Sequence, residues 1–416
     1  MEELTAKYGL PKDVKFCTNC VISNQRPSSE IEFKHTSKTK KPTISFDKNG
    51  VCAACNFQIK KDTEIDWKDR LEALKVLLDE HRSKSGKYDV IVSGSGGKDS
   101  VYACYMLRKE FDMHPLTVTW SPHIYTDIGW KNFQSWIHAG YDNMLFTPNG
   151  KVHRLLTRLA VENLFHPFQP FILGQKNLAP KLAAMHDIPL IFYGENEAEY
   201  GNPIDENLTP KRDESYYSTQ LDYDKIFLGG VSATSLMEDY GLEEQDMIPY
   251  LPADKNKLRD VGVEVRYMGY YTRWDPQEAY YKAVEHTGFE ANPFRTEGTY
   301  SKYSSLDDRI DGFHYWTTYI KFGIGRATYD AAQEIRNEKI TRDEGVRLVH
   351  KYDGEYPTRY LDEIMQYLDM TEERFLGLAE QFRSPHLWKK EDAEWKLRHV
   401  VDFKDGDINK REISGI

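Results

Sequence analysis

The segment Ile91–Ser100, IVSGSGGKDS, combines glycine, serine, lysine and aspartate in the manner of a phosphate-binding loop. Glycines let backbone N–H groups turn toward an anion, and the start of a following helix adds its positive end. Two common nucleotide motifs do not fit. The pattern GxxxxGK followed by Ser or Thr meets Val92 at its first glycine and Asp99 at its last position. The pattern GxGxxG meets Asp99 at its last glycine.

The remaining pattern, Ser95-Gly96-Gly97-Lys98-Asp99-Ser100, resembles the SGGxDS loop of the ATP pyrophosphatases. Enzymes with this loop cleave ATP between its α- and β-phosphates, so that a substrate oxygen becomes adenylated. Asp99 would repel bare phosphate, but it suits a Mg²⁺ ion placed between the carboxylate and the phosphates. The resemblance implies that Lys98 and Asp99 are catalytic, with Asp99 as the magnesium ligand. It also implies an ATP site that includes Ser93, Ser95, Gly96, Gly97, Asp99 and Ser100.

Four of the five cysteines form two pairs, Cys17-x-x-Cys20 and Cys52-x-x-Cys55, separated by 31 residues. Each pair places two thiolates on one side of a tight turn, and two pairs complete a tetrahedral site of four sulfurs. We expect structural zinc, because a closed site of this kind has no open position for catalysis. An iron–sulfur or redox role and free thiols are the alternatives. The fifth cysteine, Cys104, lies on the apolar stripe of the helix after the loop and is expected in the core.

The elements that must position these residues can be predicted from hydrophobic periodicity. Five apolar runs indicate strands, at Tyr88–Val92, Leu116–Trp120, Asn143–Phe146, Pro189–Tyr193 and Gly262–Tyr267. Amphipathic stretches alternate with them, for example at Asp66–His81, Val152–Leu164 and Leu182–His186. This alternation predicts a parallel sheet flanked by helices.

The rest of the chain is less regular. The stretch 200–260 is polar and has little periodicity, which indicates a long excursion over the sheet. From Asp275 onward the pattern is largely helical, with helices predicted at Ala327–Ile335 and Arg342–His350. The charge-rich stretch His386–Arg411 is interpreted as a solvated tail helix.

Composition limits the classes of protein that fit. The chain has 416 residues, 40% of them hydrophobic, so it is long enough for two or three folded domains. No run approaches the ~18 apolar residues of a membrane span, and the N-terminus shows no signal-peptide core, so we expect a cytoplasmic protein. A formal net charge of −11 argues against a nucleic-acid coat.

Several longer blocks resemble the N-acetyl sugar amidotransferases, which make acetamidino sugars for bacterial surface polysaccharides. Besides the cysteine pairs and the loop, the blocks are LIFYGENEAEYG (190–201), GYYTRWDP (269–276), EGTYSKYSSLDD (297–308) and IKFGIGRATYDAAQEIRNEKITRDEGVRLVHKYDGEYP (320–357). The resemblance runs from Cys17 to about Pro357, and the stretch Asn207–Pro249 matches less clearly. It implies an α/β fold of the HUP-like (adenine nucleotide alpha hydrolase-like) class, with an N-terminal zinc ribbon and a mainly helical C-terminal region.

The reaction implied by the resemblance uses ATP to adenylate the acetamido oxygen of a nucleotide-activated N-acetyl sugar. Ammonia then replaces that oxygen, and the products are an acetamidino sugar, AMP and PPi for LPS O-antigen or nonulosonic acid biosynthesis. A glutaminase needs a nucleophilic cysteine, either at the N-terminus or beside a histidine. The chain begins Met1-Glu2, and Cys104 is its only cysteine outside the pairs. We therefore expect a separate glutaminase partner.

Further site residues follow from these blocks and from the sheet edge where such folds bind ligands. Trp120 is expected to contact adenine or to be a buried aromatic residue at the end of its strand. Gly194 and Glu195 are expected in the ATP site, where Glu195 would bind magnesium or the ribose, or would instead cap a helix. Lys321 is expected as a catalytic cation, and Lys302 and Arg326 near phosphates, with solvated helix charges as the alternative. Asp307 and Asp308 are candidates for a metal or sugar hydroxyl, or for a helix cap. His314 is expected to be packed.

Together these features predict three regions. Residues 1–65 form a zinc-ribbon-like module, residues 66–272 the ATP pyrophosphatase domain, and residues 273–416 a mainly helical substrate-binding region. The alternative function is a tRNA-modifying enzyme of the thiolation type, which would favour a basic surface and additional cysteines. A zinc-ribbon adaptor without catalysis is disfavoured by the intact Ser95–Ser100 loop.

Overall fold

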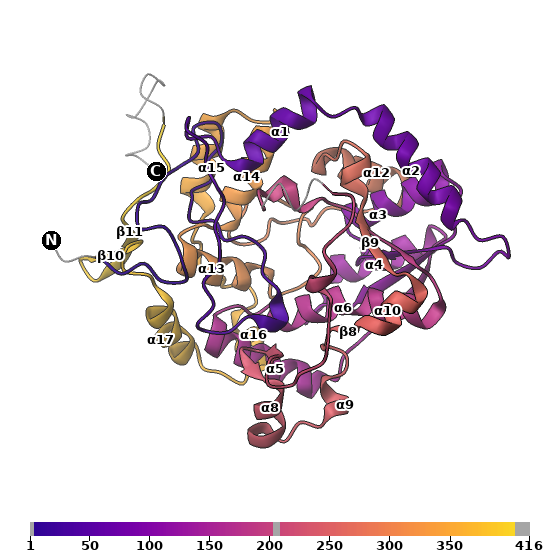
Figure 1. Cartoon of the computed structure of the whole chain (residues 1–416). Coiled ribbons are helices and arrows are strands. Elements are labelled where there is room, and N and C mark those ends of the chain that lie inside the picture. The colour runs from indigo at the N-terminus through magenta and orange to yellow at the C-terminus, as the bar shows by residue number, and fades with distance from the viewer. Residues whose placement is uncertain (1–3, 203–208, 404–416) are drawn as a thin grey trace.

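The computed structural model describes residues 4–202 and 209–403. A five-stranded parallel sheet lies at its centre, in the order β3-β2-β1-β4-β9 (Figure 1). The strands are β1 (Val90–Ser93), β2 (Pro115–Trp120), β3 (Asp142–Phe146), β4 (Leu190–Tyr193) and β9 (Glu264–Tyr267). The predicted strands are confirmed. From β1 the chain adds β2 and β3 on one side and then β4 and β9 on the other. Where the order reverses, a crevice is expected at the carboxyl ends of β1 and β4.

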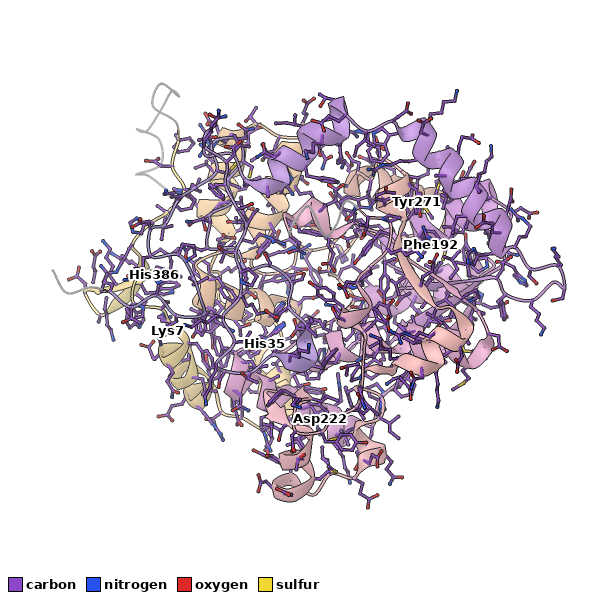
Figure 2. All side chains as sticks on the ribbon, viewed as in Figure 1. Lys7, His35, Phe192, Asp222, Tyr271 and His386 are labelled. Atoms are coloured by element: carbon purple, nitrogen blue, oxygen red, sulfur yellow. The ribbon has the colours of Figure 1, made fainter. Side chains whose placement is uncertain are left out.

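Helices cover both faces of the sheet. One face packs against α5 (Gly150–Leu164) and α6 (Gln169–His186) through Ile91, Val118 and Ile191. The opposite face packs through Val90, Val92 and Phe192 against a second group of helices. These are α2 (Trp67–His81), α3 (Lys98–Tyr105), α4 (Asp127–His138), α11 (Met268–Tyr271) and α12 (Pro276–Thr287). Figure 2 shows Phe192 of β4 beside Tyr271 of α11, and their ring centroids are 6.1 Å apart.

The excursion predicted at 200–260 is more ordered than its composition indicates. Its described part contains short elements that pack against α5 and α6 through Ile226, Leu236 and Tyr250. The helices are α8 (Ala233–Tyr240), α9 (Glu244–Met247) and α10 (Lys255–Val261). The strands are β5 (Ser218–Thr219), β6 (Phe227–Leu228), β7 (Val231–Ser232) and β8 (Ala253–Asp254). The stretch Asn207–Pro249, for which no function is predicted, lies in this layer from residue 209 onward.

The C-terminal region is helical, as predicted, up to residue 382. It contains α13 (Asp311–Phe322), α14 (Arg326–Arg336), α15 (Arg342–Tyr352), α16 (Leu361–Leu368) and α17 (Glu372–Phe382). The predicted tail helix at His386–Arg411 is wrong for its described part, because β10 (Trp388–Glu391) and β11 (Glu394–Leu397) form an antiparallel hairpin. Asp392 and Ala393 both adopt positive φ at its turn. Residues 404–411 of that prediction lie outside the described residues.

The N-terminal segment lies against this C-terminal region, as the indigo and orange ribbons of Figure 1 show. The helix α1 (Ala53–Thr63) begins directly after Cys52. Cys17, Cys20, Cys52 and Cys55 share a hydrophobic cluster with Ala331 and Ala332 of α14 and Val346 of α15. Within residues 4–202 and 209–403, no helix is long and apolar enough to cross a membrane.

Candidate functional site

A cavity of about 620 Å³ lies at the carboxyl ends of β1 and β4. Segments far apart in the chain form its walls. They are the N-terminal segment (Arg26, Ser29, Glu32), the glycine loop (Ser93–Ser100), α6 (Ile172, Gln175, Lys176), the stretch after β4 (Gly194–Asn202) and residues 303–311. Its position is that of ligand sites in open parallel sheets.

The glycine loop turns sharply between β1 and α3. Gly96 has φ +82°, and a Cβ there would lie 3.0 Å from the Cα of Phe133, so only glycine fits without strain. The Thr119 hydroxyl donates to the Gly94 carbonyl (2.7 Å), and the Ser100 hydroxyl donates to the Gly97 carbonyl (2.9 Å). Gly97 is the N-cap of α3, so the first turn of that helix faces the cavity. The predicted ATP-site residues of the loop all line the cavity.

Asp99 is held by two neighbours. One carboxylate oxygen accepts a hydrogen bond from the Trp274 indole (3.1 Å), and the other is 2.5 Å from the Lys98 ammonium. That ammonium also lies 5.6 Å from the centroid of the Trp274 ring. Trp274 is 1% exposed and belongs to the block GYYTRWDP. The sequence predicted Lys98 and Asp99 for this site, but it gave Trp274 no role.

The end of β4 meets the loop from the other side. A Cβ on Gly194 would lie 2.7 Å from the Asp99 carbonyl oxygen, so this glycine allows the two segments to touch. Next to it, the Oε2 atom of Glu195 is buried and has no hydrogen-bond partner among the described residues. Burial, and then the charge of Asp99, raise the pKa of Glu195 to about 8. Asp99 is already paired with Lys98, but the unpartnered Glu195 oxygen beside it is of the kind that a divalent cation binds.

Residues 303–311 form the wall opposite β4 and bring the predicted Asp307 and Asp308 to the cavity. Burial raises the pKa of Asp307, while a hydrogen bond from Ser95 of the glycine loop lowers it. Asp308 accepts hydrogen bonds from the backbone N–H groups of His123 (2.7 Å) and Ile310 (3.1 Å). Its Oδ2 atom also lies 2.7 Å from Nδ1 of His123. Asp307 therefore faces the loop, whereas Asp308 ties its own segment to the chain after β2.

Three predicted residues lie away from the cavity. Trp120 is 3% exposed and stacks on Phe146 at 5.1 Å inside the core, which corresponds to the buried alternative. The Lys302 ammonium donates to the Pro293 carbonyl (3.0 Å) at an exposed position. Lys321 is 5% exposed, and its ammonium donates to the Leu164 carbonyl at the end of α5 (2.6 Å). None of the three lines the cavity: Trp120 ends strand β2 inside the core, Lys302 lies in a loop, and Lys321 projects from α13 toward α5.

The remaining predicted residues, Arg326, His314 and Cys104, are not among the residues that line the cavity. Arg326 pairs with Asp330 (2.8 Å), lies 5.3 Å from the Tyr315 ring centroid, and its charge lowers the pKa of Glu195. His314 is packed, as expected, with its ring 4.9 Å from that of Phe168. Cys104 is fully buried and burial raises its pKa, so the prediction of a core thiol is confirmed.

Three basic residues of the cavity had no sequence signal. Arg26, Lys176 and Arg212 come from the N-terminal segment, α6 and the stretch before α8. They share no motif, spacing or periodicity, and only the fold brings them together.

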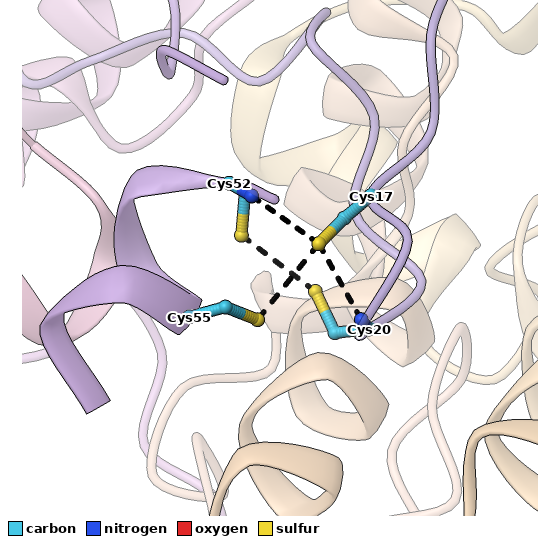
Figure 3. Close-up of side chains that lie close together, drawn as sticks. All are labelled: Cys17, Cys20, Cys52 and Cys55. Carbon is cyan, nitrogen blue, oxygen red and sulfur yellow. Dashed lines mark hydrogen bonds between the residues drawn. The ribbon is translucent and has the colours of Figure 1, made fainter. Parts of the chain in front are cut away.

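The four paired cysteines converge on one point (Figure 3). Their sulfur atoms all lie within 4.8 Å of one another, and the Cys17–Cys55 and Cys20–Cys52 sulfurs are each 3.8 Å apart. The Cys17 sulfur accepts backbone hydrogen bonds from Asn19, Cys20 and Cys52 at 3.3–3.4 Å. Hydrogen bonds, first with Cys20 and then with Cys52 and Cys55, lower the pKa of Cys17. A cluster of four buried thiols with these donors fits a bound metal.

Comparison with known families identifies the C-terminal region. Residues 297–401 match the family described as "LPS biosynthesis protein WbpG-like, C-terminal domain". The matched stretch contains Asp307, Asp308 and Arg326. This match supports the resemblance to the N-acetyl sugar amidotransferases and a role in sugar biosynthesis.

Two individual proteins are also similar. An uncharacterized protein of Methanocaldococcus jannaschii, MJ1599, is 37% identical over 84 residues, which are 20% of this chain and 29% of that protein. The U34-tRNA thiolase NcsA from Methanococcus maripaludis, solved with its [4Fe-4S] cluster, is 12% identical with a TM-score of 0.25. That likeness covers 80% of this chain and 95% of the other. At this TM-score it bears on neither the ligand nor the reaction.

Proposed function

We propose, on the premise that residues 297–401 form a WbpG-like C-terminal domain, that the chain is an ATP-dependent amidotransferase acting on a nucleotide-activated N-acetyl sugar. One observation carries the proposal: this domain and the SGGxDS loop line the same cavity. The first supplies Asp307 and Asp311, and the second supplies Ser95 to Ser100. A loop that would bind ATP and a domain similar to one of LPS biosynthesis therefore line the same cavity.

The chemistry is adenylation followed by substitution. The acetamido oxygen attacks the α-phosphorus of ATP, the bond to the β-phosphate oxygen breaks, and pyrophosphate leaves. Ammonia adds to the resulting imidate carbon, a proton is released, and the carbon–oxygen bond to AMP breaks. An amide is a poor electrophile, and adenylation converts its oxygen into a leaving group. Alignment and charge stabilisation therefore supply most of the catalysis.

The cavity residues suit these steps. The N–H groups of the Gly96–Gly97 turn and the hydroxyls of Ser95 and Ser100 would hold phosphate oxygens. Lys98 would neutralise charge on the departing pyrophosphate. Asp99 and Glu195 would hold Mg²⁺, whose charge stabilises the same leaving group when bound. Asp307 would accept a hydrogen bond from a sugar hydroxyl.

Ammonia is proposed to come from a separate glutaminase. Cys104 is fully buried in the hydrophobic core, and burial raises its pKa, so it cannot act as a thiolate nucleophile. The other four cysteines are gathered in one metal-type cluster. Because the reaction consumes ATP, we place it in the cytoplasm.

Zinc is the metal we propose for the cysteine cluster. A tetrahedral ion with zinc–sulfur bonds of about 2.3 Å holds its sulfurs about 3.8 Å apart. Two sulfur pairs lie at that distance. An iron–sulfur cluster inserts several atoms between the thiolates and would need a wider opening. The site has no open position, so its role would be to hold the N-terminal segment in place.

The test is an assay with ATP, Mg²⁺, an ammonium salt and a panel of UDP- and CMP-linked N-acetyl sugars. Mass spectrometry is expected to show AMP together with a sugar in which one oxygen has been replaced by NH. If AMP forms only with tRNA, or never forms, the proposal fails.

Asp99→Asn is the matching variant. The amide keeps the hydrogen bond from Trp274 but loses the charge that would bind Mg²⁺, so turnover is expected to disappear while the melting temperature stays near wild type. Asp239→Asn, at an exposed position of α8, is the control and should leave turnover unchanged. Full activity of Asp99→Asn would contradict the metal role.

A further inference from the structure

The cavity contains a second set of cations that the loop chemistry does not use. Arg26, Lys176 and Arg212 line it beyond β4, on the side of the sheet edge β9. We propose that these three residues bind the phosphate of the nucleotide-activated sugar, while the glycine loop binds the phosphates of ATP. This inference rests on the proposed function, and it adds which end of the cavity binds the nucleotide-activated sugar.

The position of Arg212 separates the two sites. Its backbone N–H donates to the Val265 carbonyl of β9 (2.8 Å), and the backbone of Lys211 forms an antiparallel β-bridge with that of Arg266. This segment therefore covers the outer edge of the sheet. The glycine loop follows β1, and β4 and β9 lie between them. Neighbouring strands are about 4.8 Å apart, which places the two backbones roughly 10–15 Å from each other. That separation leaves room for a sugar between two sets of phosphates.

The Arg212 side chain is pre-positioned for an anion. Its guanidinium lies 4.9 Å from the Tyr216 ring centroid and 2.5 Å from a carboxylate oxygen of Glu197. The side chain is 8% exposed, yet its Nε has no hydrogen-bond partner among the described residues. An aromatic face and one carboxylate hold the planar group while leaving a donor open, which suits a phosphate oxygen.

Lys176 is the least compensated of the three. It lines the cavity from α6 and makes no hydrogen bond or ion pair with any described residue. Its ammonium lies 5.7 Å from the centroid of the Tyr216 ring. Burial, and then the charge of Arg212, lower the pKa of Lys176 to about 8. A desolvated ammonium beside another cation is costly unless an anion joins it.

Arg26 brings the N-terminal segment into the same site. It is 6% exposed and donates to the side chain of Asn202 (3.2 Å), and its Nε also has no partner among the described residues. Asn202 in turn donates to Glu197 (3.2 Å), which pairs with Arg212. Glu32 and Glu197 are the carboxylates near these cations, whereas Glu195 and Asp307 lie by Asp99 and Ser95 of the glycine loop. Three cations therefore stand beside two carboxylates at this end.

Tyr193 and Gln175 are polar, uncharged residues of the cavity wall. The Tyr193 hydroxyl donates to the backbone carbonyl of Gln175 (3.5 Å). Burial raises the pKa of Tyr193, whereas the charge of Arg212 and a hydrogen bond with Ser93 lower it, so this side chain lies near both sites. Hydroxyl and amide groups in this position suit a sugar ring whose acetamide points toward the α-phosphate.

The test measures binding without turnover, so it is independent of the assay of the reaction. UDP and CMP are titrated separately by calorimetry into the full chain saturated with a non-hydrolysable ATP analogue. Wild type is expected to bind one of them. Lys176→Met should weaken that binding by about 10-fold or more, as expected for loss of a charge-assisted hydrogen bond. The affinity for the ATP analogue should stay within about 2-fold.

Two further variants keep the result decisive. Lys176→Arg retains the positive charge and should bind the nucleotide nearly as tightly as wild type. If Lys176 only filled space, binding would not depend on whether the replacement is charged. Lys151→Met, at an exposed position of α5, removes a charge elsewhere and should change nothing. The inference is overturned if wild type binds neither nucleotide, or if Lys176→Met binds it as tightly as Lys151→Met does. It is equally overturned if Lys176→Met weakens binding of the ATP analogue instead.

Discussion

Asp99 shows how a catalytic carboxylate can be oriented before any ligand arrives. One oxygen accepts the Trp274 indole N–H and the other meets the Lys98 ammonium, so the side chain has little freedom to rotate. Trp274 lies 175 residues further along the chain. We regard it as a positioning residue, since it touches the carboxylate and does not itself line the cavity.

Trp274→Phe tests this positioning role. The ring volume is largely kept but the hydrogen bond to Asp99 is lost, so kcat is expected to fall about 10- to 100-fold through misalignment. The Mg²⁺ concentration for half-maximal rate should rise as well, which a packing defect alone would not cause. Trp136→Phe is the matched control, because Trp136 is also fully buried but makes no hydrogen bond with Asp99. Equal losses in both variants would contradict the role.

Lys321 gives a prediction about pH. Burial lowers its pKa to about 7, so between pH 7 and 10.5 the unfolded chain holds a proton that the folded chain has released. Stability from this group therefore rises with pH in that window, by up to about 1.4 kcal/mol per pH unit. In Lys321→Met this increment should vanish. Urea unfolding of both proteins at pH 7 and pH 9 measures this change in the free energy of unfolding. An equal change with pH in wild type and Lys321→Met would contradict the prediction.

At the scale of elements, the parallel sheet was predictable and the C-terminal hairpin was not. The three central strands β1, β2 and β4 are short apolar runs buried on both faces, whereas the edge strands β3 and β9 are only partly buried. A buried apolar run of this length has few other interpretations. The hairpin strands Trp388–Glu391 and Glu394–Leu397 are charge-rich, and their turn at Asp392-Ala393 carries no glycine. Lys321 shows the same limit within the site: its neighbours along the chain suggested phosphate, but the orientation of α13 directs it to α5.

The contact between the end of β4 and the first turn of α3 can be tested at Gly194. In Gly194→Ala the new methyl group would meet the Asp99 backbone at 2.7 Å, and both segments would have to shift. We expect a loss of about 1–3 kcal/mol in stability and loss of measurable ATP binding. Gly377→Ala on α17 has nothing within 4 Å and should be neutral or stabilising. Unchanged ATP affinity in Gly194→Ala would count against the contact.

On the scale of the whole molecule, the cavity is assembled from all three predicted regions. Arg26 comes from the N-terminal segment, Asp99 from the sheet domain and Asp307 from the helical region. Lys61 and Glu199 form a buried ion pair (2.7 Å) that joins α1 to the stretch after β4. The cysteine cluster is therefore expected to influence a cavity wall that it does not touch.

Metal analysis tests this coupling. We expect one zinc per chain and no iron–sulfur absorption. Cys55→Ser should lose the metal, unfold at lower temperature and bind the nucleotide sugar more weakly, because Arg26 and Ser29 depend on the cluster for their position. Cys104→Ala should keep one zinc. Retention of full nucleotide-sugar affinity in metal-free Cys55→Ser would show that the cluster and the cavity are independent.

The N-terminal segment is also hydrogen-bonded to the chain after α17, where Figure 2 shows Lys7 near His386. The Lys7 N–H donates to the Ser384 hydroxyl (2.9 Å), which lies 2.8 Å from His386. The opposite nitrogen of that imidazole is 3.0 Å from Gln25. On the ribosome, residues 7–25 emerge before residues 384–386 and cannot complete these contacts until the latter have been synthesised. The cysteine cluster also packs against Val401, so a nascent protein stalled before Ser384 would leave part of this surface exposed to chaperones and proteases.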